Sequence, residues 1–142
     1  MRQSYTVIGD AVNLGSRLEG ITKQYGVGLI VGEGTRELVK KEFVFRELDR
    51  VKVKGKDEPV GIYEPIGEEG SVSKEDLDEL KLWNQALRQY RAQEWDSAEV
   101  SLMNLARIKP RYLYELYGER IAHYRQDPPG DNWDGSWKFD TK

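Results

Sequence analysis

The sequence has no cysteine and a single histidine, His123, among its 142 residues. Without cysteine the chain cannot form a disulfide, a thiolate metal site or a cysteine nucleophile, and one histidine cannot form a histidine cluster. No apolar run approaches the roughly 18 residues that a membrane span needs, and the start of the chain lacks a basic-then-apolar leader. We therefore expect a cytoplasmic chain that makes no direct membrane contact.

An excess of basic charge is also lacking, because 25 Asp and Glu residues outnumber 22 Lys and Arg residues and give a net charge of −3. A nucleic-acid-binding domain usually needs a basic face, so we expect no nucleic-acid partner. The sequence is 33% charged, 38% hydrophobic and 11% aromatic. This composition is sufficient for a solvated surface around a core, and the length fits one ordinary domain or two small ones.

Tryptophan is confined to the second half of the chain. A polar, glycine-bearing stretch at residues 67–73 precedes the tryptophans, and such a composition is typical of a linker. We therefore expect one domain over residues 1–67 and another over residues 68–142. The four tryptophans are Trp83, Trp95, Trp133 and Trp137.

The first half alternates strand and helix patterns. Period-two apolar residues and turn signals predict strands, and apolar residues three or four apart predict helices. The predicted order is β-α-β-α-β-β, an α+β arrangement with helices on one face of a sheet. The predicted strands are residues 4–8, 25–31, 43–53 and 60–66, with a turn at 54–57, and the helices are residues 11–21 and 32–40.

The second half has a helical period and ends in a Trp-rich segment. Helices are predicted over residues 80–93, 95–108 and 112–125, and the prolines after Asp127 end the last one. The W-x2-A-L-x2-Y spacing that begins at Trp83 is typical of a tetratricopeptide-like helical hairpin. We expect the Trp and Tyr side chains to be packing groups, with a ligand box as the alternative.

Two polar residues on the first predicted helix could hold an anion. Asn13 and Arg17 are four residues apart, so they share one side of a helix that begins at Ala11. An amide and a permanently charged guanidinium near a helix N-terminus suit phosphate oxygens on which negative charge builds. The alternative is that both residues lie on an ordinary solvated helix face.

A row of basic residues follows on the predicted hairpin. The four cations alternate with Val51 and Val53, and a strand period of two places them together on one face. Such a row can contact a polyphosphate, or it can be the solvated face of a hairpin. Thr6, on the first predicted strand, could likewise be an ordinary strand residue. The four cations are Arg50, Lys52, Lys54 and Lys56.

Three strings in order resemble a known family. They are YTVIGDAVNLGSRLE, TKQYGVGLIV and VKVKGKDEPVGIYE, at residues 5–19, 22–31 and 51–64. Together they resemble the carboxy-terminal half of the catalytic domain of class III adenylate/guanylate cyclases, which implies a partial ferredoxin-like sheet with helices. The helical second half resembles the tails of bacterial cyclases that carry a CHASE-type sensor and membrane spans upstream, so the parent protein could be attached to a membrane.

The resemblance implies a role for each matching position. Asn13 and Arg17 match the catalytic pair that steadies the ribose and the phosphoryl charge. Lys54 matches the lysine that holds the terminal phosphates of ATP. Thr6 matches the purine-selecting position, which places the chain in the threonine subgroup. In this family ATP is converted to cyclic AMP and pyrophosphate with Mg or Mn ions.

The resemblance covers only half of a catalytic domain. The family's metal-binding aspartates belong to the amino-terminal half, and we assign no metal ligand in this chain; Asp10, Asp49 and Asp57 are interpreted as a helix cap and hairpin residues. We therefore expect no metal bound to this chain, an inactive isolated chain, and a tendency to form homodimers or to self-associate. The alternative is a non-catalytic dimerisation or protein-interaction module.

Overall fold

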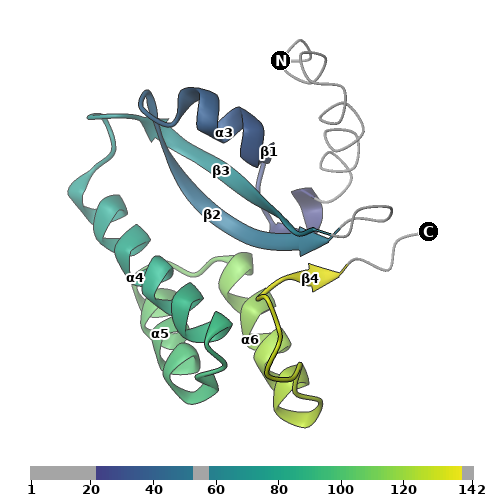
Figure 1. The fold of residues 1–142 in the computed structure, drawn as a ribbon. Coiled ribbons are helices and arrows are strands. Elements are labelled where there is room, and N and C mark those ends of the chain that lie inside the picture. The colour runs from purple at the N-terminus through teal and green to yellow at the C-terminus, as the bar shows by residue number, and fades with distance from the viewer. Residues whose placement is uncertain (1–21, 53–57, 139–142) are drawn as a thin grey trace. The chain divides into compact units, whose positions relative to one another are not determined.

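The computed structural model describes residues 22–52 and 58–138, which form a mixed α+β structure (Figure 1). The predicted strand at residues 4–8, the predicted helix from Ala11 and the predicted turn at residues 54–57 lie outside these ranges. The elements are β1 (Val31–Gly32), α3 (Glu33–Val39), β2 (Phe43–Lys52), β3 (Val60–Glu68), α4 (Lys74–Arg91), α5 (Trp95–Ile108), α6 (Tyr112–Gln126) and β4 (Trp137–Lys138). The α+β class is thus observed, whereas the ferredoxin-like and tetratricopeptide-like assignments stay predictions.

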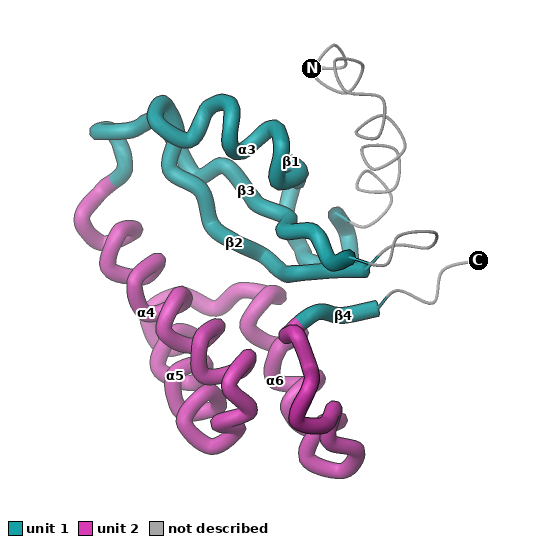
Figure 2. Tube along the Cα trace, in the orientation of Figure 1, with its two compact units in different colours: residues 1–72, 136–142 teal, residues 73–135 magenta. Residues whose placement is uncertain are grey.

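The chain divides into two compact units (Figure 2). The first unit ends at Val72 and resumes at Ser136, and the second runs from Ser73 to Gly135. Sequence composition placed the boundary at residue 67, inside the polar stretch. In the structure β3 extends to Glu68, which pairs with Phe43, so the polar stretch contains the end of a strand as well as the connection.

The first unit is built on a four-stranded sheet with the order β1-β3-β2-β4. Strands β2 and β3 are antiparallel neighbours, as the alternating pattern predicts, and β1 is antiparallel to β3. Strand β4 lies parallel to β2 on its other side. Sequence reasoning did not predict β4, because a two-residue strand has too short a pattern to recognise.

The predicted strand at residues 25–31 is wrong. Residues 22–25 are helical, and only Val31 of this run belongs to a strand. Gly26 has a φ of 69°, and the hydrogen bonds from Gly26 N to Lys23 O and from Val27 N to Thr22 O close the helix end. A left-handed glycine with this bond pair terminates a helix and interrupts an extended chain, so the apolar run supplies core residues rather than a sheet strand.

Helix α3 confirms the short helix expected after residue 32. It runs from Glu33 to Val39 with Gly32 at the N-cap. The Glu33 carboxylate accepts a hydrogen bond from the backbone N–H of Gly61 in β3, with an N–O distance of 2.9 Å. A side chain of the first helical turn thus satisfies a strand donor and attaches the helix to the sheet.

The second unit consists of α4, α5 and α6. Helix α5 has the predicted bounds, and α6 ends one residue after its predicted end. Helix α4 begins at Lys74, earlier than residue 80, because the Ser73 hydroxyl accepts a hydrogen bond from the Asp76 N–H at 3.1 Å and caps the helix. The charged first turns of α4 have few apolar residues, so the apolar period alone does not detect them. No helix among residues 22–52 and 58–138 is long and apolar enough to cross a bilayer.

Aromatic side chains from the three helices form the core of the second unit. Trp83 of α4 and Tyr117 of α6 have ring centroids 5.0 Å apart at 86°, and Tyr90 lies 4.8 Å from Tyr117 at 70°. Both are edge-to-face geometries that aromatic pairs prefer. All three residues are buried. They therefore act as packing groups, as the sequence analysis expected.

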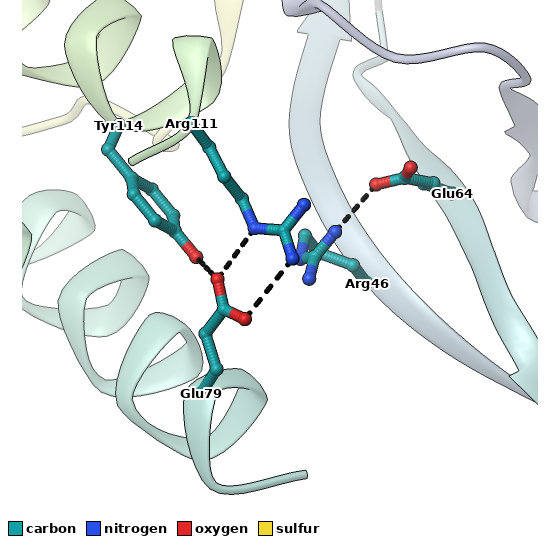
Figure 3. Close-up of polar contacts among 5 residues, drawn as sticks. All are labelled: Arg46, Glu64, Glu79, Arg111 and Tyr114. Atoms are coloured by element: carbon teal, nitrogen blue, oxygen red, sulfur yellow. Dashed lines mark hydrogen bonds and ion pairs between the residues drawn. The ribbon is translucent and has the colours of Figure 1, made fainter. Parts of the chain in front are cut away.

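A buried carboxylate joins α4 to the start of α6 (Figure 3). Glu79 Oε2 accepts a hydrogen bond from Arg111 Nε at 2.6 Å and another from the Tyr114 hydroxyl, and Glu79 Oε1 accepts from Arg111 Nη2 at 3.2 Å. Glu79 is buried, so its negative charge needs stabilisation by donors such as Arg111 and Tyr114. The contact fixes how the first residues of α6 meet α4.

Replacing Glu79 with alanine should destabilise the second unit. The change leaves the Arg111 guanidinium, whose side chain is 26% exposed, without its carboxylate. We expect the free energy of unfolding to fall by about 2–3 kcal/mol, somewhat less than for a fully buried pair. Urea unfolding followed by tryptophan fluorescence measures this, with exposed Glu75→Ala in the same helix as the control. Equal effects of the two changes would show that the Glu79 contact contributes little.

Candidate functional site

The four predicted site residues lie outside the described ranges. These residues are Thr6, Asn13, Arg17 and Lys54. Their roles therefore stay predictions. The structure does describe the strand that leads into residue 54 along the sequence, and this strand carries the first half of the predicted basic row.

A β-bulge in β2 decides which side chains face the core. Glu47 pairs with Tyr63 and Asp49 pairs with Ile62, so Leu48 is the additional residue on β2. Leu48 and Asp49 are both buried, although they are adjacent in sequence. A bulge of this kind changes the alternation of a strand from that point onward. The even-numbered positions face inward before the bulge and the odd-numbered positions after it.

The bulge therefore turns Arg50 and Lys52, the described members of the basic row, away from the core. Val51 is buried, while Arg50 and Lys52 on the opposite face are half-buried. The period-two prediction is confirmed for this described pair of cations. Without the bulge, Arg50 and Lys52 would share the inward parity of Leu48, where desolvation of two cations would oppose folding.

Asp49 holds the bulge in place. Its Oδ2 accepts a hydrogen bond from the Tyr25 hydroxyl at 2.5 Å, and its Oδ1 accepts from the Arg50 backbone N–H at 2.8 Å. Both Tyr25 and Asp49 are buried. Sequence reasoning missed this pair because Tyr25 lies 24 residues away and was expected to be in a strand. The only feature of the sequence that could have indicated this pair was an acidic residue beside a predicted apolar position in β2.

A second charged residue in β2, Arg46, has a structural role. Arg46 and Glu64 are directly opposite in the β2–β3 register, and Arg46 Nη1 lies 2.7 Å from Glu64 Oε1 (Figure 3). Arg46 precedes the bulge, and its side chain is buried. Arg46 therefore forms an ion pair across the β2–β3 hairpin, and it is not one of the outward-facing cations.

The described residues show no metal-binding group. Within residues 22–52 and 58–138, no three His, Asp or Glu side chains lie together in a way that could hold a metal ion. The buried Asp49 carboxylate is occupied by the Tyr25 hydroxyl and a backbone N–H.

Part of the chain is similar to adenylate cyclases of known sequence. It is 56% identical over 62 residues to an adenylate cyclase of Anabaena cylindrica, covering 42% of this chain and 12% of that protein. It is 43% identical over 84 residues to the terminal-differentiation-specific adenylate cyclase of Dictyostelium discoideum, covering 57% and 4%. It is 39% identical over 66 residues to adenylate cyclase 1 of Rhizobium meliloti, covering 46% and 10%.

These matches support a relationship with the cyclase family over part of the chain. The matched segments span no more than 12% of the length of these curated relatives. No family model matches the chain, and no solved structure matches it. The comparisons thus agree with the resemblance drawn from the sequence motifs, at the level of adenylate cyclases in general.

Replacing Tyr25 with phenylalanine should loosen the bulge. The change removes the hydroxyl donor from a buried carboxylate, so we expect the free energy of unfolding to fall by about 1.5–3 kcal/mol. Hydrogen exchange of the β2 peptide containing Asp49 and Arg50 should become faster. Tyr112→Phe, at an exposed position in the second unit, is the matched control. Unchanged exchange in Tyr25→Phe would show that the hydroxyl does not hold the bulge.

Proposed function

We propose that this chain is the carboxy-terminal part of a class III adenylate cyclase of the threonine subgroup. The observation that carries the proposal is its similarity to three proteins named adenylate cyclase. In the reaction the 3′-hydroxyl of ATP attacks the α-phosphorus, the bond between the α-phosphorus and its bridging oxygen breaks, and pyrophosphate leaves. The hydroxyl proton passes to solvent or to a base outside this chain.

Four residues carry the proposed half-site. Asn13 positions the ribose, and Arg17 balances the negative charge that develops on the α-phosphoryl oxygens. Lys54 binds the terminal phosphates, and Thr6 contacts the purine. The outward-facing positions of Arg50 and Lys52 after the bulge support a cationic face on β2, the strand that precedes Lys54 in the sequence.

The proposal gives this chain no metal-binding role. Among residues 22–52 and 58–138 no group of three His, Asp or Glu side chains suited to a metal ion is found, which is compatible with this proposal. In the parent enzyme we place the Mg or Mn ligands on the amino-terminal half of the catalytic domain, and we propose that the isolated chain is inactive. The helical second unit is then the tetratricopeptide-like tail of a bacterial cyclase in the cytoplasm, with any membrane attachment upstream.

Complementation with the other half of the catalytic domain should restore cyclic AMP formation. We expect Asn13→Ala and Arg17→Ala to lower the recovered rate about 100-fold to 1000-fold, because each removes a donor to developing charge. Asn104→Ala and Arg107→Ala, at exposed positions of α5, are controls of the same residue types and should keep the parent rate. The measurement is cyclic AMP produced from ATP with Mg or Mn.

A different result would favour the non-catalytic alternative. If the complemented sample binds ATP but makes no cyclic AMP, and both variants behave like the parent, the chain is better explained as an interaction module. Helix α5 would then be its contact surface, since Val100 and Met103 are both 56% exposed. Measuring ATP binding and cyclic AMP formation on the same samples separates the two outcomes.

The isolated chain should self-associate. Among the described residues of the first unit, β1 pairs with Tyr63 and Ile62 of β3, and Leu38 and Phe43 are exposed. A short edge strand and exposed apolar side chains favour pairing with another copy. Light scattering over a range of concentrations should show a mass above that of the monomer. A constant monomer mass at high concentration would contradict this expectation.

A further inference from the structure

The outer face of α5 carries a regular row of four exposed residues. Helix α5 packs against α4 and α6 (Figure 1), and its buried side chains face these two helices. Asp96, Val100, Met103 and Arg107 follow one another at spacings of four, three and four residues, and all are exposed. At about 100° per residue these positions lie within about 60° of one another, on the side opposite the buried residues. We call these four residues the α5 stripe.

The α5 stripe has the pattern of a contact between two helices. Spacings of four, three and four residues are those of the a and d positions at which paired helices meet. The two central residues, Val100 and Met103, are apolar and each is 56% exposed. A carboxylate stands at one end of the stripe and a guanidinium at the other. Covering the centre with a second helix would remove apolar surface from water, which is favourable.

The α5 stripe is complementary to a second copy of itself in reverse direction. When two copies of α5 pack antiparallel about a two-fold axis between residues 101 and 102, Val100 of each copy faces Met103 of the other. The same axis places Asp96 of each copy opposite Arg107 of the other. A parallel pair would instead bring like charges together at both ends, and these repel. Antiparallel helix dipoles add to the preference. Charge complementarity thus selects a second copy in one orientation.

The acidic end of the stripe keeps its sign although it has an intramolecular contact. Arg125 of α6 lies 2.9 Å from Asp96 Oδ1 and 2.9 Å from Glu99 Oε1, so two carboxylates share one guanidinium. The Asp96 side chain is 92% exposed, and its carboxylate has a second oxygen that can accept from another donor. The three groups together carry one negative charge, which attracts an arginine of a second copy.

We propose that α5 is a homodimer contact in which the α5 stripes of two copies pack antiparallel. The centre has only four apolar side chains, fewer than a large stable interface contains, so we expect a weak dimer at high protein concentration. The contact belongs to the second unit and does not depend on the proposed function. It also differs from association through the exposed apolar residues of the first unit, so the two surfaces can be tested separately.

Sedimentation equilibrium of the full 142-residue chain tests the apolar centre. We expect Met103→Gln to weaken dimerisation about tenfold, because the two-fold axis makes one substitution remove two apolar contacts. Leu77→Gln, at an exposed position of α4, is the matched control and should dimerise as the parent does. Equal dissociation constants of Met103→Gln and the parent would overturn the proposal. So would a loss of dimer in Leu38→Gln of the first unit that Met103→Gln does not share.

Charge reversal tests the antiparallel orientation. Asp96→Arg and Arg107→Asp each place like charges opposite one another, so either variant alone should dimerise about fivefold more weakly than the parent. An equimolar mixture of the two variants should dimerise again, because every end contact then joins opposite charges. Both variant chains keep a net negative charge, so general attraction between them does not explain the recovery. A mixture that dimerises no better than its components would overturn the proposal.

Cysteine substitution locates the contact, because the chain has no cysteine of its own. A mixture of Val100→Cys and Met103→Cys chains should form an intermolecular disulfide under mild oxidation. A mixture of Val100→Cys and Leu77→Cys chains is the control and should cross-link much more slowly. Equal rates in the two mixtures would place self-association outside the α5 stripe.

These outcomes are independent of cyclic AMP formation. The residues of the proposed half-site belong to the first unit, whereas the α5 stripe belongs to the second, so each proposal can fail alone. If complementation yields no cyclic AMP while the mixed charge variants dimerise, the cyclase proposal fails and the α5 contact stands. If cyclic AMP forms while the mixed variants stay monomeric, the α5 contact fails alone.

Discussion

The hydrogen bond between the Tyr25 hydroxyl and the buried Asp49 carboxylate is the constraint on which the first unit depends. It stabilises an additional residue, Leu48, at a point where regular pairing would continue the alternation of β2. Because two adjacent residues at the bulge are buried, Val51 lies in the core and Arg50 faces away from it. This contact, between residues 24 positions apart in the sequence, thus helps to fix which side chains of β2 after the bulge face away from the core.

Local patterns in the sequence predicted most of the regular structure. The β2–β3 hairpin, α3, α5 and the extent of α6 follow from apolar periodicity and turn residues, which act over a few positions. The wrong predictions come from features that apolar periodicity does not contain. The run at residues 25–31 has the composition of a strand, but Gly26 in the left-handed region ends a helix there, and the start of α4 depends on a cap rather than on apolar spacing.

The candidate site was predictable to the extent that it depends on sequence motifs and strand parity. Period two placed Arg50 and Lys52 on one face, and the structure agrees because no bulge separates them; the bulge that precedes both makes this face the outward one. Strand β4 had no such signal, since its position depends on a two-residue pairing with β2, which precedes the second unit in the sequence. Contacts of this kind form only in the folded chain, and a two-residue strand has no periodic pattern that could predict them.

The position of β4 in the sheet depends on a short pairing with β2. Strand β4 pairs over two residues, whereas β2 and β3 pair along most of their length, so β4 has few hydrogen bonds to set against the entropy of closing a long connection. Segments with few bonds open first and without global unfolding. Opening of β4 would separate Trp137 from Val51 while the pairing of β2 with β3 stays in place.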